Sequence, residues 1–217
     1  MISSSRNDWL VPAALIVLSV VPVIAGTVRL TELANGAAIT PANARFFAAP
    51  LPVVLHIFTV SIYCVLGAFQ FSPGFRRRKP AWHRAAGRLL IPCGLAAGLT
   101  GLWMTHSYPP VAADGALLYG FRILFGSAMV GCIILGVASI RRRDFVQHGA
   151  WMMRGYAIGL GAGTQVLTHL PWFLLYGKPE GLSRALLMGA GWVINLIVAE
   201  RIIRQRSVQP IRSSAAA

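Results

Sequence analysis

The sequence predicts an all-α protein, a polytopic bundle of about six transmembrane helices. Apolar residues make up 56% of the 217 positions and charged residues only 12%, about half the charged share usual in soluble domains. The apolar residues gather in long runs, each close to the roughly 20 residues that cross a bilayer. The basic residues lie between these runs, so membrane topology explains the net charge of +14 better than a nucleic-acid partner does.

Six segments have the length and composition of a membrane span. In order they cover residues 9–30, 51–71, 88–106, 117–140, 149–175 and 182–203. The first contains no charge over residues 9–28. That is longer than the core of a signal peptide, and no small-x-small cleavage site stands out, so we interpret this segment as a span. We expect residues 1–206 to form one transmembrane domain and residues 207–217 to be a disordered tail.

The distribution of arginine and lysine predicts the orientation. With the amino terminus in the cytoplasm, fifteen basic residues fall on the cytoplasmic side and five on the other. The positive-inside rule therefore predicts a multi-pass protein of the bacterial inner membrane with both termini in the cytoplasm. The basic residues predicted on the outer side are Arg29, Arg45, Arg122, Lys178 and Arg184.

Two basic stretches resemble each other. Residues 76–88 read RRRKPAWHRAAGR and residues 141–159 read RRRDFVQHGAWMMRGYAIG; in each, a histidine follows the last of three arginines by five residues. The histidines are His83 and His148, and a further arginine follows each of them before a long apolar segment. The shared pattern indicates a parallel internal repeat of spans two and three with spans four and five.

His83 and His148 are the main candidate cofactor ligands. Their equal distance from the arginine triplets predicts one depth on neighbouring helices. Neutral imidazole is a good axial ligand for haem iron, and helix bundles build such sites from facing helices. Arg88 and Arg154 would lie one to two turns deeper, where guanidinium groups can pair with haem propionates. The sequence thus predicts a haem b site at the cytoplasmic face.

A second candidate site, at the outer face, pairs His56 with His169. His169 follows His148 by 21 residues, which returns it to nearly the same face of a continuous helix. Because 21 helical residues span about 32 Å, the whole apolar thickness, one site at either face is as consistent with the sequence as two. Contact with lipid headgroups, or a hydrogen bond between helices, is the competing explanation for these histidines.

These motifs also carry a family resemblance. The matching residues are Gln70-Phe71, Trp82-His83-Arg84, Gly87-Arg88, Arg142-Arg143-Asp144, His148, Trp151-Met152, Arg154 and Tyr156-Ala157. They resemble a family of predicted bacterial membrane proteins with a domain of unknown function, over roughly residues 51–169. Gly149 departs from the pattern, because an arginine is expected beside the histidine. The resemblance implies a polytopic inner-membrane protein and assigns no reaction.

A looser similarity is to b-type cytochrome bundles of the ferric-reductase and ascorbate-reducing kind. It depends on histidines at both faces, arginines near them and glycine-rich helices. The leading hypothesis is electron transfer by bound haem, a membrane oxidoreductase activity, with a quinone, a metal ion or a redox protein as partner. A small-molecule or ion carrier without a redox cofactor, and a non-catalytic accessory or assembly protein, are the alternatives. The carrier would use a polar path of Arg154, His148, His169 and Asn195.

Overall fold

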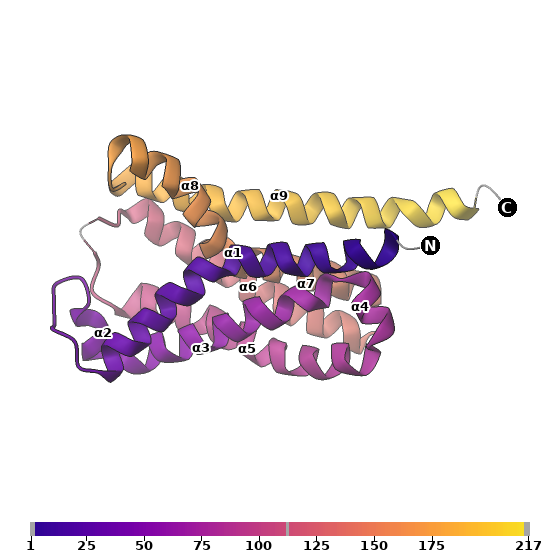
Figure 1. Cartoon of the computed structure of the whole chain (residues 1–217), viewed down its shortest axis with the longest axis horizontal. Helices are drawn as coiled ribbons and strands as arrows, with labels where there is room; N and C mark the ends of the chain where they lie inside the picture. Colours follow the sequence, from indigo (N-terminus) through magenta and orange to yellow (C-terminus); the bar gives the residue numbers. More distant parts are fainter. Residues whose placement is uncertain (1–2, 112, 215–217) are drawn as a thin grey trace.

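The computed structural model describes residues 3–111 and 113–214, with side chains for residues 9–111 and 113–206. Within this part the chain forms an elongated all-helical bundle without strands (Figure 1). In chain order the elements are α1 (Ser3–Ala34), α2 (Ala44–Ala48), α3 (Pro50–Gly67), the 3-10 helix η1 (Ala68–Phe71), α4 (Pro73–Arg78), α5 (Pro80–Ser107), α6 (Ala116–Arg141), α7 (Phe145–Gly159), α8 (Gly161–Tyr176) and α9 (Gly181–Ser214).

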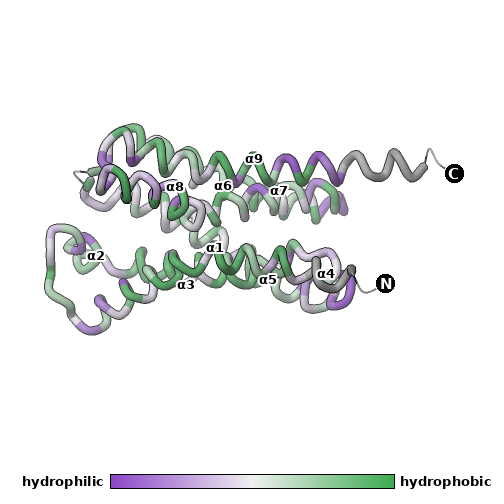
Figure 2. Tube along the Cα trace, turned by 45° about the horizontal axis from the view of Figure 1, so that its top comes forward, coloured by the Kyte–Doolittle hydropathy of each residue, from purple (hydrophilic) through white to green (hydrophobic). Residues whose placement is uncertain are grey.

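Five helical segments are long and apolar enough to cross a membrane. They are Trp9–Ala34, Pro50–Phe71, Pro80–Ser107, Ala116–Arg141 and Gly181–Arg206. Apolar residues cover the middle of these helices, and hydrophilic residues concentrate towards the ends of the bundle (Figure 2). Five of the six predicted spans are therefore confirmed, although the third begins at Pro80, eight residues earlier than predicted, and the chain is a multi-pass helical membrane protein.

The remaining predicted span, residues 149–175, is broken. Helix α7 ends at Gly159 and α8 begins at Gly161, with Leu160 between them. Glycines next to the break have no side chain, so α8 can pack closely against neighbouring helices. A Cβ on Gly161 would lie 2.3 Å from the Trp192 ring, and a Cβ on Gly163 would lie 2.2 Å from the Leu18 carbonyl oxygen. The prediction of one continuous helix here was wrong, because close packing on α1 and α9 requires the change of direction.

Polar side chains from α9 and α8 form hydrogen bonds around the break. The Asn195 side-chain amide donates to the Ala157 carbonyl oxygen (3.0 Å) and its oxygen accepts from the Thr164 hydroxyl (2.7 Å). The Gln165 amide donates to the Met188 carbonyl oxygen (3.1 Å). Breaks in a membrane helix leave backbone groups that must find partners within the protein, and Asn195 provides one. Asn195 therefore links α9 to both α7 and α8.

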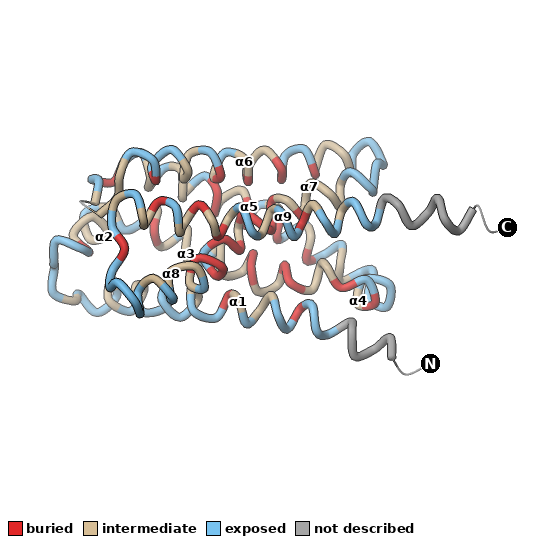
Figure 3. The backbone as a smooth tube through the Cα atoms, turned by 90° about the horizontal axis from the view of Figure 1, so that it is seen from above, coloured by how far each residue is buried: buried red, intermediate tan, exposed pale blue. Residues whose placement is uncertain are grey.

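The helices pack as three neighbouring pairs. Helix α3 packs chiefly on α5, α6 on α7, and α8 on α9, while α5 also packs on α6. The buried residues gather along the middle of the bundle (Figure 3), where Tyr63, Leu90, Ile133 and Tyr156 belong to one apolar core. The pairs α3–α5 and α6–α7 correspond to the proposed repeat units, and the repeat itself stays a prediction.

The described helices bring the basic loops to the same end of the bundle as both termini. Helix α4, with Arg76 in its last turn, and the start of α5 lie at this end (Figure 1). We call it the basic end. Asp144 begins α7 there, since its side chain accepts from the backbone N–H of Gln147 (2.9 Å) and caps the helix. Helix α9 continues to Ser214, residues 215–217 lie outside the described part, and disorder of the 207–217 tail stays a prediction.

Candidate functional site

A cavity of about 740 Å³ opens at the basic end, and we call it the basic cavity. It lies between α3, α5, α6, α7 and α9, and among the described residues no acidic side chain lines it. Most of its wall is apolar, with Leu90, Ile133 and Met152 among the lining residues. The exposed arginines at its mouth are Arg76, Arg84 and Arg206. Its size is in the range of cofactor and ligand sites, roughly 300–1,000 Å³.

His83 and His148 both line this cavity. His83 is in the first turn of α5 and His148 in the first turn of α7. Each imidazole is close enough to the other to interact electrostatically, and His83 also interacts with Arg76 and Arg84. The spacing from the two arginine triplets therefore identified two side chains that face one space from separate helices.

The two imidazoles differ in their hydrogen bonds. His148 Nδ1 lies 2.9 Å from the Gly136 carbonyl oxygen, and since a carbonyl only accepts, this nitrogen carries the proton. The other ring nitrogen, Nε2, then has a free lone pair, which is the arrangement typical of metal-ligating histidines. His83 Nδ1 is buried and has no hydrogen-bond partner among the described residues, an unfavourable state unless a ligand compensates for it.

Arg154 has a partner of its own. Its guanidinium forms a bidentate salt bridge with Glu200 on α9, with Nη2 at 3.0 Å from Oε2, and it stacks on the Trp151 ring at 4.7 Å. The sequence hypothesis assigned Arg154 to a haem propionate. Its charge is instead largely neutralised by a carboxylate within the protein, although the side chain does line the basic cavity.

Arg88 points elsewhere. It is exposed and does not line either cavity. Five residues of helix separate it from His83, which corresponds to about 140° around the axis, so the two side chains cannot face the same space. The cations at the cavity mouth come from α4, from the first turns of α5 and from α9 rather than from the predicted position of Arg88.

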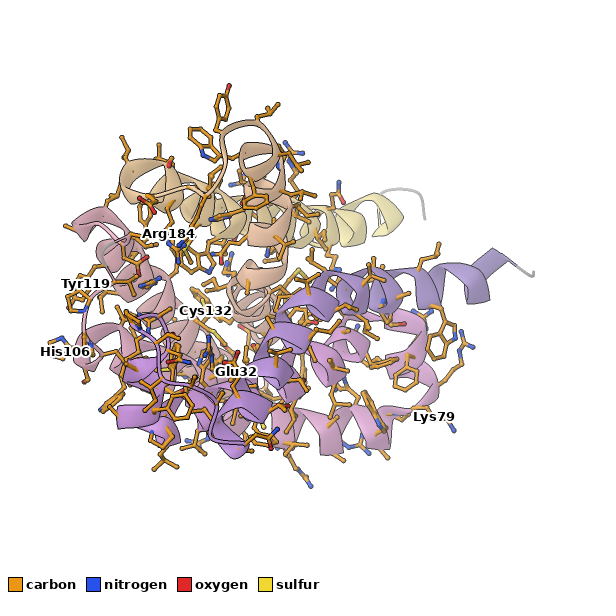
Figure 4. All side chains as sticks on the ribbon, turned by 60° about the vertical axis from the view of Figure 1, so that its left-hand side comes forward. Glu32, Lys79, His106, Tyr119, Cys132 and Arg184 are labelled. Carbon is orange, nitrogen blue, oxygen red and sulfur yellow. The ribbon has the colours of Figure 1, made fainter. Side chains whose placement is uncertain are left out.

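The structure does not bring His56 and His169 together in one cavity. His56 Nδ1 donates to the Ala97 carbonyl oxygen on α5 (2.9 Å), whereas His169 Nδ1 donates within α8 to the Gln165 carbonyl oxygen (2.7 Å). Because the chain breaks at Leu160, the heptad argument that placed His169 on the face of His148 does not hold. His106 lies at the periphery beside Tyr119 (Figure 4).

A second cavity, of about 450 Å³, lies toward the opposite end. We call it the Arg45 cavity, because Arg45 of α2 lines it together with Arg122 of α6 and His56 of α3. Most of its wall is apolar, and again no acidic side chain of the described residues contributes. Sequence reasoning missed this site, since its lining residues come from several helices that are far apart in the chain, among them α1, α2, α3, α6 and α9.

An aromatic layer separates the two cavities. Tyr63 and Tyr156 are buried against each other with ring centroids 5.6 Å apart, and both line the basic cavity. The Tyr156 hydroxyl donates to the carbonyl oxygen of Cys64 (2.6 Å), whose side chain lines the Arg45 cavity. Gly159 allows this packing, since a Cβ there would lie 3.0 Å from the Tyr63 ring. The layer lies beside the break at Leu160.

Groups of three or more histidine, cysteine, aspartate or glutamate side chains suited to a metal ion do not occur in the part of the chain with described side chains. The cysteines Cys64, Cys93 and Cys132 are buried and unpaired. A haem site differs in needing only two imidazoles from the protein, and His83 and His148 are the two histidines that line the basic cavity.

The fold and these cavities define a polytopic helical membrane protein with buried polar sites. The comparison with protein families agrees: the chain belongs to a family of predicted membrane proteins (DUF2306), which matches residues 53–203, well over half of its length. This confirms the resemblance drawn from the motifs. No curated protein and no solved structure matches the chain. The matched region includes His83 and His148 and begins after Arg45.

Proposed function

We propose that this membrane protein binds one b-type haem in the basic cavity and transfers electrons through it. The observation that carries the proposal is that His83 and His148, from α5 and α7, line one cavity free of acidic lining residues in the described part of the chain. The buried Nδ1 of His83 has no hydrogen-bond partner among the described residues, so this imidazole keeps hydrogen-bonding capacity that a bound ligand would use.

Different residues of the basic cavity would contact different parts of the haem. His148 presents a lone pair on Nε2 because its Nδ1 proton is held by the Gly136 carbonyl oxygen. Apolar walls exclude water from the depth of the cavity, and the exposed arginines at the mouth, Arg76, Arg84 and Arg206, offer charge-assisted hydrogen bonds to carboxylates. When bound, haem supplies one-electron redox chemistry. The electron donor or acceptor in this proposal is a quinone, a metal ion or a redox protein.

The test is the absorption spectrum of the full-length protein purified from haem-replete membranes. We expect a Soret band and reduced α-bands that are lost in His83→Ala and in His148→Ala. His106→Ala is the matched control, because His106 lines neither cavity, and it should keep the wild-type spectrum. A folded wild-type protein without a Soret band would overturn the proposal.

A carrier without a redox cofactor is the second candidate. The observation that favours it is the pair of cavities on either side of the Tyr63–Tyr156 layer, next to a broken helix, since broken helices beside central sites are a feature of secondary transporters. The same spectrum separates the candidates, because a carrier would fold without haem. In both cases we propose an inner-membrane location with the basic end in the cytoplasm.

A further inference from the structure

The Arg45 cavity has an excess of positive charge that the protein does not neutralise. Two acidic side chains are close to it, and each already forms salt bridges with other arginines. The Asp114 carboxylate accepts from Arg122 (2.7 Å) and from Arg184 (2.8 Å), while Glu32 forms a salt bridge with Arg29. Three arginines thus share the two carboxylates in this region. The guanidinium left over is that of Arg45.

Arg45 is held in place without an anionic partner. Its guanidinium lies 4.6 Å from the Phe46 ring centroid, and Arg29 lies 4.7 Å from the same ring. Arg45 Nε is buried without a hydrogen-bond partner, and its side chain forms no salt bridge with the described residues. Burial lowers the pKa of Arg45; Asp114 opposes this, and Arg122 and Arg29 lower it further. The side chain nevertheless stays protonated.

An unpaired, partly buried cation is unfavourable unless a counter-charge reaches it. A guanidinium binds a carboxylate or a phosphate in a planar, two-bond geometry, and a singly charged carboxylate costs less to move into a mostly apolar cavity than a doubly charged phosphate does. The ligand must also fill the apolar remainder of the cavity. That space runs from α2 towards the middle of the bundle, between side chains such as Val60, Met129 and Trp192.

We propose that the Arg45 cavity binds a small amphipathic carboxylate, with the carboxylate on Arg45 and the apolar body against α3, α6 and α9. The ligand enters from the end of the bundle opposite the basic end. This site is separate from the basic cavity, and its occupancy does not depend on haem. Arg45 precedes the region matched by the family, so the site is inferred from this chain alone.

Octanoate and octanol are suitable probes, because they share an eight-carbon chain and differ in charge. Each is titrated calorimetrically into the full-length protein in dodecyl maltoside, with empty micelles as the blank. We expect octanoate to bind and octanol to bind about tenfold or more weakly, since a charge-assisted pair is lost. Arg45→Gln should remove this preference, whereas Arg45→Lys should keep most of it.

Ser61→Leu tests the apolar part of the same cavity, which Ser61 lines. The added side chain should weaken both probes without changing their ratio, and it provides a second variant should Arg45→Gln not fold. Equal binding of the two probes by the wild type, or unchanged octanoate binding by Arg45→Gln, would overturn the proposal.

The remaining source of an anion is a lipid headgroup. Octanoate binding is therefore repeated in nanodiscs of phosphatidylcholine alone and of phosphatidylcholine with phosphatidylglycerol. Equal binding in both supports a small carboxylate as the occupant. Loss of binding in the presence of phosphatidylglycerol would overturn that assignment in favour of an anionic lipid.

Discussion

The arginines of the bundle fall into two groups by how their charge is balanced. Arg154 and Arg122 each face a carboxylate from the protein, which offsets the cost of placing a charge near the apolar layer. Arg45 and the arginines at the mouth of the basic cavity form no salt bridge with the described residues. The balanced arginines therefore stabilise the fold, and the unbalanced ones are the candidates for binding anions.

The Arg154–Glu200 salt bridge predicts a specific pattern of stability. The two side chains are 23% and 36% exposed, so the pair lies between the surface and buried cases. Removing one partner by Arg154→Leu or Glu200→Leu should lower the free energy of unfolding by about 1–3 kcal/mol, because a charge is left unpaired. Unfolding in mixed micelles, followed by circular dichroism, measures the change.

The double variant Arg154→Leu with Glu200→Leu is the control for this pair. With no charge left unpaired, it should recover part of the loss of either single variant. Additive losses in the double variant would show that the two residues act independently.

At the scale of single residues, the sequence predicted that His83 and His148 share a site, but it did not predict the partner of Arg154 or the site at Arg45. His83 and His148 were identified because each follows a recognisable triplet of arginines by the same number of residues. Glu200 lies 46 residues after Arg154, on another helix, and nothing local marks it as the partner. Arg45 was assigned to the outer side by charge counting alone, and its cavity depends on tertiary packing.

At the scale of elements, the break at Leu160 determines where the polar side chains of α7 and α8 lie. Helix α7 directs His148 to the basic cavity, while α8 packs between α1 and α9. The sequence shows the glycines around Leu160, but glycine also occurs in continuous transmembrane helices. The direction change depends on Trp192 and Leu18, which approach Gly161 and Gly163 from distant parts of the chain.

A glycine-to-alanine pair tests this packing. In Gly163→Ala the new Cβ would lie 2.2 Å from the Leu18 carbonyl oxygen, so backbone must move. We expect the free energy of unfolding to fall by about 1–3 kcal/mol. Gly131→Ala, on α6, is the matched control, since nothing lies within 4 Å of its new Cβ. It should be neutral or gain up to about 1 kcal/mol of stability from helix propensity. Equal effects of the two variants would contradict the close approach of α8 to α1.

The whole molecule is polarised along its long axis. The termini, α4 and the arginines around the basic cavity lie at one end, and α2 with Arg45 lies at the other (Figure 1). The fold class and most spans were predictable because apolar runs of the right length are sufficient to identify them. The cavities were not, since they form where several helices leave space between them, and no single segment encodes that space.

The polarity predicts how the protein lies in the membrane, because cytoplasmic loops carry an excess of arginine and lysine. Single cysteines introduced by Lys79→Cys at the basic end and by Lys178→Cys in the turn before α9 report on the two ends. The native Cys64, Cys93 and Cys132 are buried, so their reaction with a thiol reagent should be slow. In intact spheroplasts, a membrane-impermeant maleimide should label the Lys178→Cys variant and leave the Lys79→Cys variant unlabelled until the membrane is opened. The reverse pattern would place the basic cavity outside and require its ligand to arrive from that side.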